Sequence, residues 1–318
     1  MAQMTETATS DRSRRKRERK YRLRADEGAA PGLRRIARGQ IDLATDALEA
    51  GDDRDDAIHD ARKALKRLRA LVRLARDELG DQVYRRENRA FRDAGRRLSG
   101  VRDAAVLVET LDAIAEDHRD ELPSGAFAGL RDAFCADARA ARERIEADPG
   151  RIDAVLADLR HTRGRVVTWP LRDDAGVEML APGMRRIARR GRRALRAARA
   201  DTTDETIHEL RKRAKDLWHA AQVTRPASPK PLRRLGRRAH ALSDAAGDDH
   251  DLAVLLAAAD RKASALALGE RELLEGLVAR RRAALQREAL DRGACVYKRK
   301  PGRLARRLNG SPGPAVRA

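Results

Sequence analysis

Three segments of the sequence occur twice, in the same order and at nearly constant spacing. Residues 33–38, 58–66 and 102–107 return as residues 184–189, 207–215 and 250–255, at offsets of 151, 149 and 148 residues. Self-similarity at a fixed period indicates that one structural unit is repeated. The 318-residue chain is therefore predicted to be an internal duplication, with two copies of ordinary domain size.

Both copies carry the pattern of α-helices. Abundant Ala, Leu, Arg and Glu favour helix because these side chains lose little rotamer freedom there. One apolar stripe follows the 3–4 residue spacing of a buried helix face: Ile58, Ala61, Leu65, Leu68, Val72 and Ala75. Asp52, Asp53, Asp55 and Asp56 precede or open this helix, where its dipole favours negative charge. No strand-like alternation stands out, so we predict an all-α protein, a pair of helical bundles with pseudo-twofold symmetry.

Glycine and proline divide the chain into segments. Helix breaks are expected at Gly51, Gly80, Pro123, 149–150, Pro170, 182–183, 226–231 and Gly247. Roughly ten helices of ordinary length result. The predicted parts are a basic disordered tail (1–20), the first helical repeat (21–160), a linker (161–180), the second helical repeat (181–292) and a second basic tail (293–318).

The matched positions of the repeat are unusually polar. They include the pairs His59/His208, Arg62/Arg211, Lys63/Lys212 and Lys66/Lys215. A repeat that only preserves a fold should match mainly at apolar positions. Only ten of the 70 Lys and Arg residues are Lys, yet four of those ten stand at these positions. We therefore interpret the matched cations as functional.

These cations form a stripe along one face of each helix. Spacings of 3 or 4 residues join His59, Arg62, Lys66, Arg69 and Arg73 in the first copy, and His208, Arg211, Lys215 and His219 in the second. Each stripe borders the apolar stripe, so long side chains can bury their stems and extend their charged heads. Guanidinium forks and ammonium groups both bind phosphate oxygens. Together with a net charge of +20, the stripes predict binding of a linear polyanion.

The same motifs resemble the CHAD family (conserved histidine α-helical domain). The resemblance is carried by both His-x-x-Arg-Lys-x-x-Lys segments, by Tyr21-Arg22-Leu23, and by Arg102-Asp103 and His250-Asp251. It covers most of residues 21–291. It implies two helical bundles around a basic cavity that binds inorganic polyphosphate, often at polyphosphate granules. By position it implicates His59, Arg62, Lys63, Lys66, Arg102, His208, Arg211, Lys212, Lys215 and His250.

Nucleic acid is the main alternative partner, because the basic surface and tails would attract any phosphate backbone. Aromatic residues are only 3% of the chain, which disfavours single-strand recognition by stacking. His250 with Asp248, Asp249 and Asp251 could hold a divalent ion, but the counterpart of His250 is Arg102. No P-loop, GxSxG or HExxH motif is present, and the stripes have no obvious acidic partner to hold a catalytic metal. Asp251 and Asp103 are expected to cap helices or to pair with nearby arginines. We expect a protein that is not an enzyme and needs no cofactor or metal.

Location is predicted from cysteines and hydropathy. Cys135 and Cys295 form no CxxC motif or disulfide framework, which favours a cytoplasmic protein. No segment approaches the ~18–20 apolar residues of a membrane span. The basic N-terminus lacks the apolar stretch of a secretory signal.

Overall fold

Helices are the only regular elements in the part of the chain that the structure describes. The computed structural model describes residues 20–50, 54–99 and 101–308. The first half contains α2 (Ala29–Ala50), α3 (Arg54–Leu74), α4 (Arg76–Arg97), α5 (Val101–Asp117), α6 (Ala128–Glu146) and α7 (Pro149–Arg165). The second half contains α8 (Ala181–Ala200), α9 (Asp204–Val223), α10 (Pro229–Arg261), α11 (Glu270–Tyr297) and α12 (Pro301–Ala305). Short 3-10 helices are η1 (Arg119–Glu121), η2 (Val166–Thr168), η3 (Val177–Leu180), η4 (Arg225–Ala227) and η5 (Ala263–Ala265). The predicted all-α class is confirmed.

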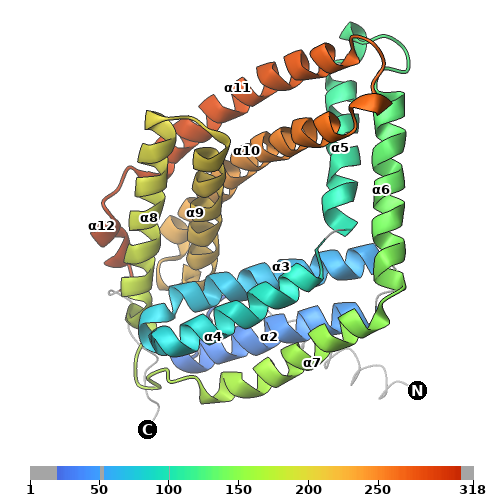
Figure 1. The fold of residues 1–318 in the computed structure, drawn as a ribbon. Helices are drawn as coiled ribbons and strands as arrows, with labels where there is room; N and C mark the ends of the chain where they lie inside the picture. Colours follow the sequence, from blue (N-terminus) through green and yellow to red (C-terminus); the bar gives the residue numbers. More distant parts are fainter. Residues whose placement is uncertain (1–19, 51–53, 100, 309–318) are drawn as a thin grey trace, which may run out of the picture.

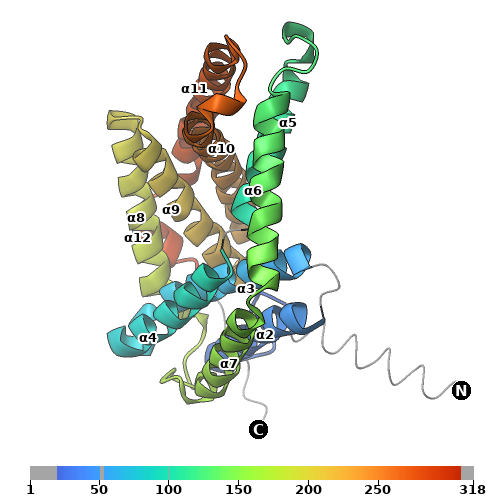
Figure 2. The same ribbon diagram turned by 45° about the vertical axis from the view of Figure 1, so that its right-hand side comes forward.

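The helices are arranged around a closed circuit (Figure 1). Helices α2, α3, α4 and α7 form one side, and α8 and α9 rise from one end of it. Helices α5 and α6 rise from the other end (Figure 2). The long helices α10 and α11 run side by side and connect the α8–α9 pair to the α5–α6 pair. Direct contacts join α3 to α9 and α5 to α10, so segments distant in sequence meet at both ends.

Two hydrophobic cores hold this arrangement together. The larger core combines residues of α2, α3, α4 and α7 with residues of α8, α9 and the first part of α10. The smaller core lies between α5, α6, the end of α10 and the start of α11. All six residues of the predicted apolar stripe, five on α3 and Ala75 directly after it, are at most 1% exposed, which confirms that stripe. Full burial of one such leucine contributes about 1.5–3 kcal/mol.

The starts of α3 and α9 are stabilised differently. Helix α3 has Asp55 and Asp56 in its first turn, as expected, whereas Asp52 and Asp53 lie outside the described residues. Helix α9 begins with a capping box, in which Thr203 Oγ1 accepts from the Thr206 amide at 3.3 Å and Thr206 Oγ1 accepts from the Thr203 amide at 2.9 Å. Both devices satisfy or neutralise the exposed amides of a helix N-terminus.

The predicted break at Gly247 is wrong. Helix α10 runs without interruption through 33 residues. A Cβ atom at Gly247 would lie 3.3 Å from the guanidinium of Arg211, so this glycine permits α9 and α10 to approach closely. In the first half the corresponding stretch is two helices, since α4 ends at Arg97 and α5 begins at Val101.

The segment boundaries also differ from those expected. Helix α7 continues to Arg165, and the buried Val166 and Trp169 anchor part of the predicted linker. Helix α11 continues through Gly293 to Tyr297, and α12 packs against α8. Buried Leu304 and Leu308 make residues 293–308 part of the fold. Apolar side chains within these basic segments, which charge counting overlooks, explain the difference. Residues 1–19 and 309–318 lie outside the described residues.

Among the described residues, no helix combines the length and apolarity that a membrane crossing requires.

Candidate anion-binding surface

Helix α3 presents most of its predicted cations to solvent. His59, Lys63 and Lys66 are exposed, and Arg62 is half-buried. The Arg62 guanidinium donates to the carbonyl of Leu98 at the end of α4, at 3.4 Å. Lys63 lies 3.8 Å from the carboxylate of Asp60, one turn earlier on the same helix. This end of α3 is an open surface rich in positive charge.

The other end of α3 is occupied by internal contacts. Arg69 donates to the side-chain oxygen of Asn88 on α4 at 3.4 Å. Burial and the neighbouring Arg73 lower the pKa of Arg69. Arg73 forms an ion pair with Asp216 of α9, a residue that also accepts from Arg213 at 2.9 Å. Arg69 and Arg73 therefore join helices, which separates them from the exposed cations predicted with them.

Helix α9 carries its cations beneath α10. His208, Arg211 and Lys215 are half-buried, and Lys212 is exposed. Arg211 lies 3.4 Å from the carboxylate of Asp251 on α10. Lys212 pairs with Glu209 of its own helix at 2.7 Å, in the same i,i+3 relation as Lys63 with Asp60. The two helices thus repeat one local pattern in different degrees of burial.

Two histidines lie side by side at the start of the α9 stripe. The rings of His208 and His250 are 4.3 Å apart between centroids. Burial, then His250, lowers the pKa of His208 to about 4, and burial and Arg211 lower the pKa of His250. Among the described residues, no group hydrogen-bonds to the buried Nδ1 of His208. His208 is therefore neutral at physiological pH in the free protein.

Lysines from α3 and α9 converge between the two helices. Lys215 has a pKa lowered to about 8, first by burial and then by Arg211 and Lys66. Asp244 and Asp251 of α10 act in the opposite direction on Lys215, but more weakly. A pKa depressed in this way means that positive charges are held together at an energetic cost.

As expected, Asp251 pairs with a nearby arginine, and Asp216 is a further acidic partner of the cations. Asp216 lies between Arg73 and Arg213, and Asp251 lies beside Arg211. Asp216 stands 149 residues after Arg67, so it departs from the repeat at a matched position. That departure was the available sequence signal for an ion pair between the two halves.

One predicted residue does not present its side chain at this surface. His219 is buried, stacks on Trp218 at 4.6 Å and meets the ring of Tyr21 at 5.6 Å. Burial lowers its pKa to about 3, and these contacts place His219 in the interior and not among the exposed cations. Arg102 lies at the start of α5, and its side chain is outside the described residues.

The carboxylates near His250 point to different helices. Asp249 is buried and accepts from Arg282 and Gln286 of α11 at 3.0 and 2.9 Å, whereas Asp251 faces Arg211 of α9. Within the described ranges, no three His, Cys, Asp or Glu side chains are arranged to hold a metal ion. Ammonium and guanidinium groups dominate the surface, and their chemistry is the binding of anionic oxygen atoms.

Two pockets in the described part of the chain lie outside these residues. One lies between α9 and the start of α10, and the other is lined by residues such as Leu48, Ile145 and Leu156. Neither is lined by a predicted site residue.

Comparison with protein families gives one match. The model described as CHAD domain matches residues 35–260, which is more than two thirds of the chain. Comparison with curated proteins gives no match.

Proposed function

The chain belongs to the CHAD domain family, and on this premise we propose that it binds inorganic polyphosphate where α3 and α9 meet. The proposed contacts come from His59, Arg62, Lys63 and Lys66 on α3, and from His208, Arg211, Lys212, Lys215 and His250 on α9 and α10. The protein binds the chain without cleaving or extending it.

The observation that carries the proposal is the convergence of Lys66 and Lys215. These side chains come from segments 149 residues apart in sequence, yet Lys66 contributes to the lowered pKa of Lys215. Burial is the main cause of that lowering, and repulsion from Arg211 and Lys66 adds to it. A bound polyanion would offset both effects by placing negative charge beside the ammonium groups.

The arrangement of charge favours a linear ligand. Exposed basic side chains extend along α3 from His59 to Lys66, and on α9 the exposed Lys212 and the half-buried Lys215 continue the series. Polyphosphate presents a negative charge at every phosphate unit and has no bases that would need stacking partners. We further propose that α2–α7 and α8–α12 descend from one duplicated unit with pseudo-twofold symmetry. In the cell, this activity would place the protein at polyphosphate granules.

Charge reversal tests the proposal. The variant Lys66→Glu/Lys215→Glu should lose at least about tenfold in polyphosphate affinity, because two contacts become repulsive. Arg14→Glu/Arg15→Glu changes the net charge equally and is the matched control. Thermal unfolding of each variant establishes that the fold is retained. Equal losses in both variants would place binding on the N-terminal basic run instead.

Two further measurements separate the alternatives. Polyphosphate should displace duplex DNA from the protein far more effectively than DNA displaces polyphosphate; the reverse order would favour a nucleic-acid-binding function. Pure protein incubated with polyphosphate should release no inorganic phosphate. Release that exceeds a no-protein control would assign a catalytic function.

A further inference from the structure

A pocket between α9 and the start of α10 lies beside the basic surface but is separate from it. It has a cavity volume of ≈ 280 Å³. The residues that matter for its chemistry are Trp218, Arg225, Arg233, Arg237, His240 and Asp244. This volume is slightly below the ~300–1,000 Å³ of typical ligand pockets, so it suits one ring system with a small substituent.

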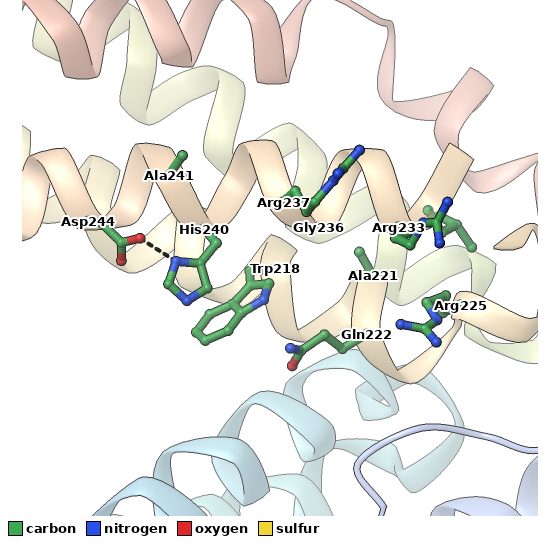
Figure 3. A pocket seen from close by; sticks show the side chains of 11 residues that line it. Trp218, Ala221, Gln222, Arg225, Arg233, Gly236, Arg237, His240, Ala241 and Asp244 are labelled. Carbon is green, nitrogen blue, oxygen red and sulfur yellow. Dashed lines mark hydrogen bonds and ion pairs between the residues drawn. The ribbon is translucent and has the colours of Figure 1, made fainter. Parts of the chain in front are cut away.

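The indole of Trp218 forms one end of this pocket (Figure 3). One face of the indole stacks on the buried His219 at 4.6 Å. The ring of His240 meets the indole edge-on at 3.9 Å, and the His240 Nδ1 hydrogen-bonds to Asp244. Trp218 is thereby held from two sides, while Ala221 and Leu232 extend the apolar lining. A rigid, apolar, aromatic wall is suited to contact with a planar ring.

Three arginines supply positive charge to the same pocket. Arg233 and Arg237 are exposed on α10, and Arg225 is half-buried in η4. In the described part of the chain, none of the three forms an ion pair with a carboxylate. Their guanidinium groups are therefore available to phosphate oxygens, for which the planar fork is well suited. At the opposite side, the Asp244 carboxylate can accept hydrogen bonds from hydroxyl groups.

The first half of the chain lacks this pocket for an identifiable reason. Trp218 and Gly236 stand 149 and 148 residues after Arg69 and Asn88, which hydrogen-bond to each other at 3.4 Å. Gly236 has no side chain, and a Cβ atom there would lie 3.8 Å from the Trp218 ring and 3.7 Å from Ala221. Replacement of the Arg–Asn pair by Trp and Gly therefore leaves space beside an aromatic ring. His240 similarly stands 148 residues after Arg92.

From these observations we propose that the pocket binds a nucleotide, with the base against Trp218 and the phosphates on Arg225, Arg233 and Arg237. A nucleotide combines the two chemical features that the pocket offers partners for, a planar ring and phosphate. The site is independent of the polyphosphate proposal, because its residues are different.

The test uses the full chain with ATP as the probe, and with inorganic triphosphate as the probe that lacks a ring. Calorimetry should show ATP binding that loses at least about tenfold in the variant Trp218→Arg/Gly236→Asn, since base–aromatic contact is removed. This variant installs the residue pair of the first half. Its affinity for polyphosphate and for triphosphate should change by less than about twofold.

A second variant keeps the test decisive if the first variant fails to fold. Arg233→Gln/Arg237→Gln alters only exposed side chains and should also weaken ATP binding severalfold. ATP affinity that survives both variants, or that is lost in Lys66→Met/Lys215→Met instead, would overturn the proposal and assign ATP to the basic surface. Absence of measurable ATP binding to the unmodified protein would overturn it as well.

Discussion

Helices α3 and α9 carry the same sequence of cations in different surroundings. Lys66 on α3 is exposed, whereas its counterpart Lys215 on α9 is half-buried and has a shifted pKa. The difference arises in the helix that follows. Uninterrupted α10 covers α9 and brings Asp244 and Asp251 to it, whereas the first half has two helices, α4 and α5, over the same stretch.

This comparison shows that the two copies of a repeated motif can contribute differently to anion binding. The α3 cations lie mostly in solvent and are suited to attract a polyanion from a distance. On α9, His208, Arg211 and Lys215 are half-buried, and burial lowers the pKa of His208 and of Lys215. Asp216, which replaces the matched Arg67, then joins the two faces through Arg73.

The largest effect on stability is expected when the ion pair between Asp216 of α9 and Arg73 of α3, here called the joint, is broken. Asp216 is only 7% exposed and lies between Arg73 and Arg213, which are 23% and 11% exposed. Asp216→Asn would leave Arg73 without its carboxylate partner and Arg213 with Glu209 alone, at a cost of about 3–5 kcal/mol in the free energy of unfolding. Urea unfolding measures this loss. The control Asp158→Asn breaks the exposed pair with Arg97, 46% and 58% exposed, and should cost less than about 1 kcal/mol. Similar small losses would mean that the joint does not stabilise the fold.

Lys215→Met should stabilise the protein near neutral pH. The pKa of Lys215 falls from 10.5 to about 8 on folding, so the folded state resists protonation. This penalty grows as pH falls from 10.5 to 8 and stays constant below. Removing the charge should therefore raise the free energy of unfolding by about 1–2 kcal/mol near pH 7, after allowance for solvent screening, with the gain fading above about pH 10. Lys66→Met, on the exposed face, should change stability by less than about 0.5 kcal/mol. A destabilised Lys215→Met variant would contradict this explanation.

Polyphosphate affinity should strengthen as pH falls through the pKa of Lys215. A bound polyanion favours the charged ammonium, so binding takes up a proton near pH 8, and affinity should rise by up to about tenfold from pH 9 to pH 7. His208, whose pKa is lowered to about 4, stays neutral over this range. Titration calorimetry in buffers of different ionisation enthalpy detects the proton. The dependence of polyphosphate affinity on pH should shrink in Lys215→Met and persist in His208→Gln/His250→Gln. The opposite result would identify the histidines as the titrating groups.

The smallest effect is expected at Gly247. A Cβ atom there would lie 3.3 Å from the Arg211 guanidinium, so Gly247→Ala should displace Arg211 and reduce polyphosphate affinity about two- to fivefold. Helix propensity should simultaneously add about 0.5–1 kcal/mol of stability. Gly276→Ala in α11 is the matched control, because nothing lies within 4 Å of its Cβ position. It should gain stability without losing affinity. Equal polyphosphate affinity of Gly247→Ala and the unmodified protein would show that binding does not depend on the position of Arg211 against α10.

Periodicity predicted the fold class and the buried stripe of α3, because helical spacing fixes which residues share a face. It did not predict which neighbour covers each end of that face. His219 lies 11 residues after His208 and thus on nearly the same face, but about 16 Å further along the helix axis. There Tyr21 and Trp218 enclose it. Burial of His219 and pairing of Arg73 depend on such tertiary neighbours.

Departures from the repeat held more information than the matches. The matches identified the cations, whereas the replacement of Arg67 by Asp216 marked the joint, and the replacement of Asn88 by Gly236 marked the pocket. Gly247 looked like a helix breaker because glycine disfavours helix, yet its small size is required by the approach of Arg211.

The smaller hydrophobic core has a consequence for the order of events on the ribosome. It combines Leu111 and Phe134 from α5 and α6 with Leu255 and Leu277 from α10 and α11. The Phe127 amide at the start of α6 donates to the Glu270 carboxylate at 2.7 Å, across 143 residues of sequence. At synthesis rates of about 5–20 residues per second, α5 and α6 emerge roughly 7–30 s before their partners. During this interval their apolar faces require cover from each other or from a chaperone. The nascent chain is thus most vulnerable to aggregation at mid-synthesis, after one complete basic helix has been made and before the second can join it.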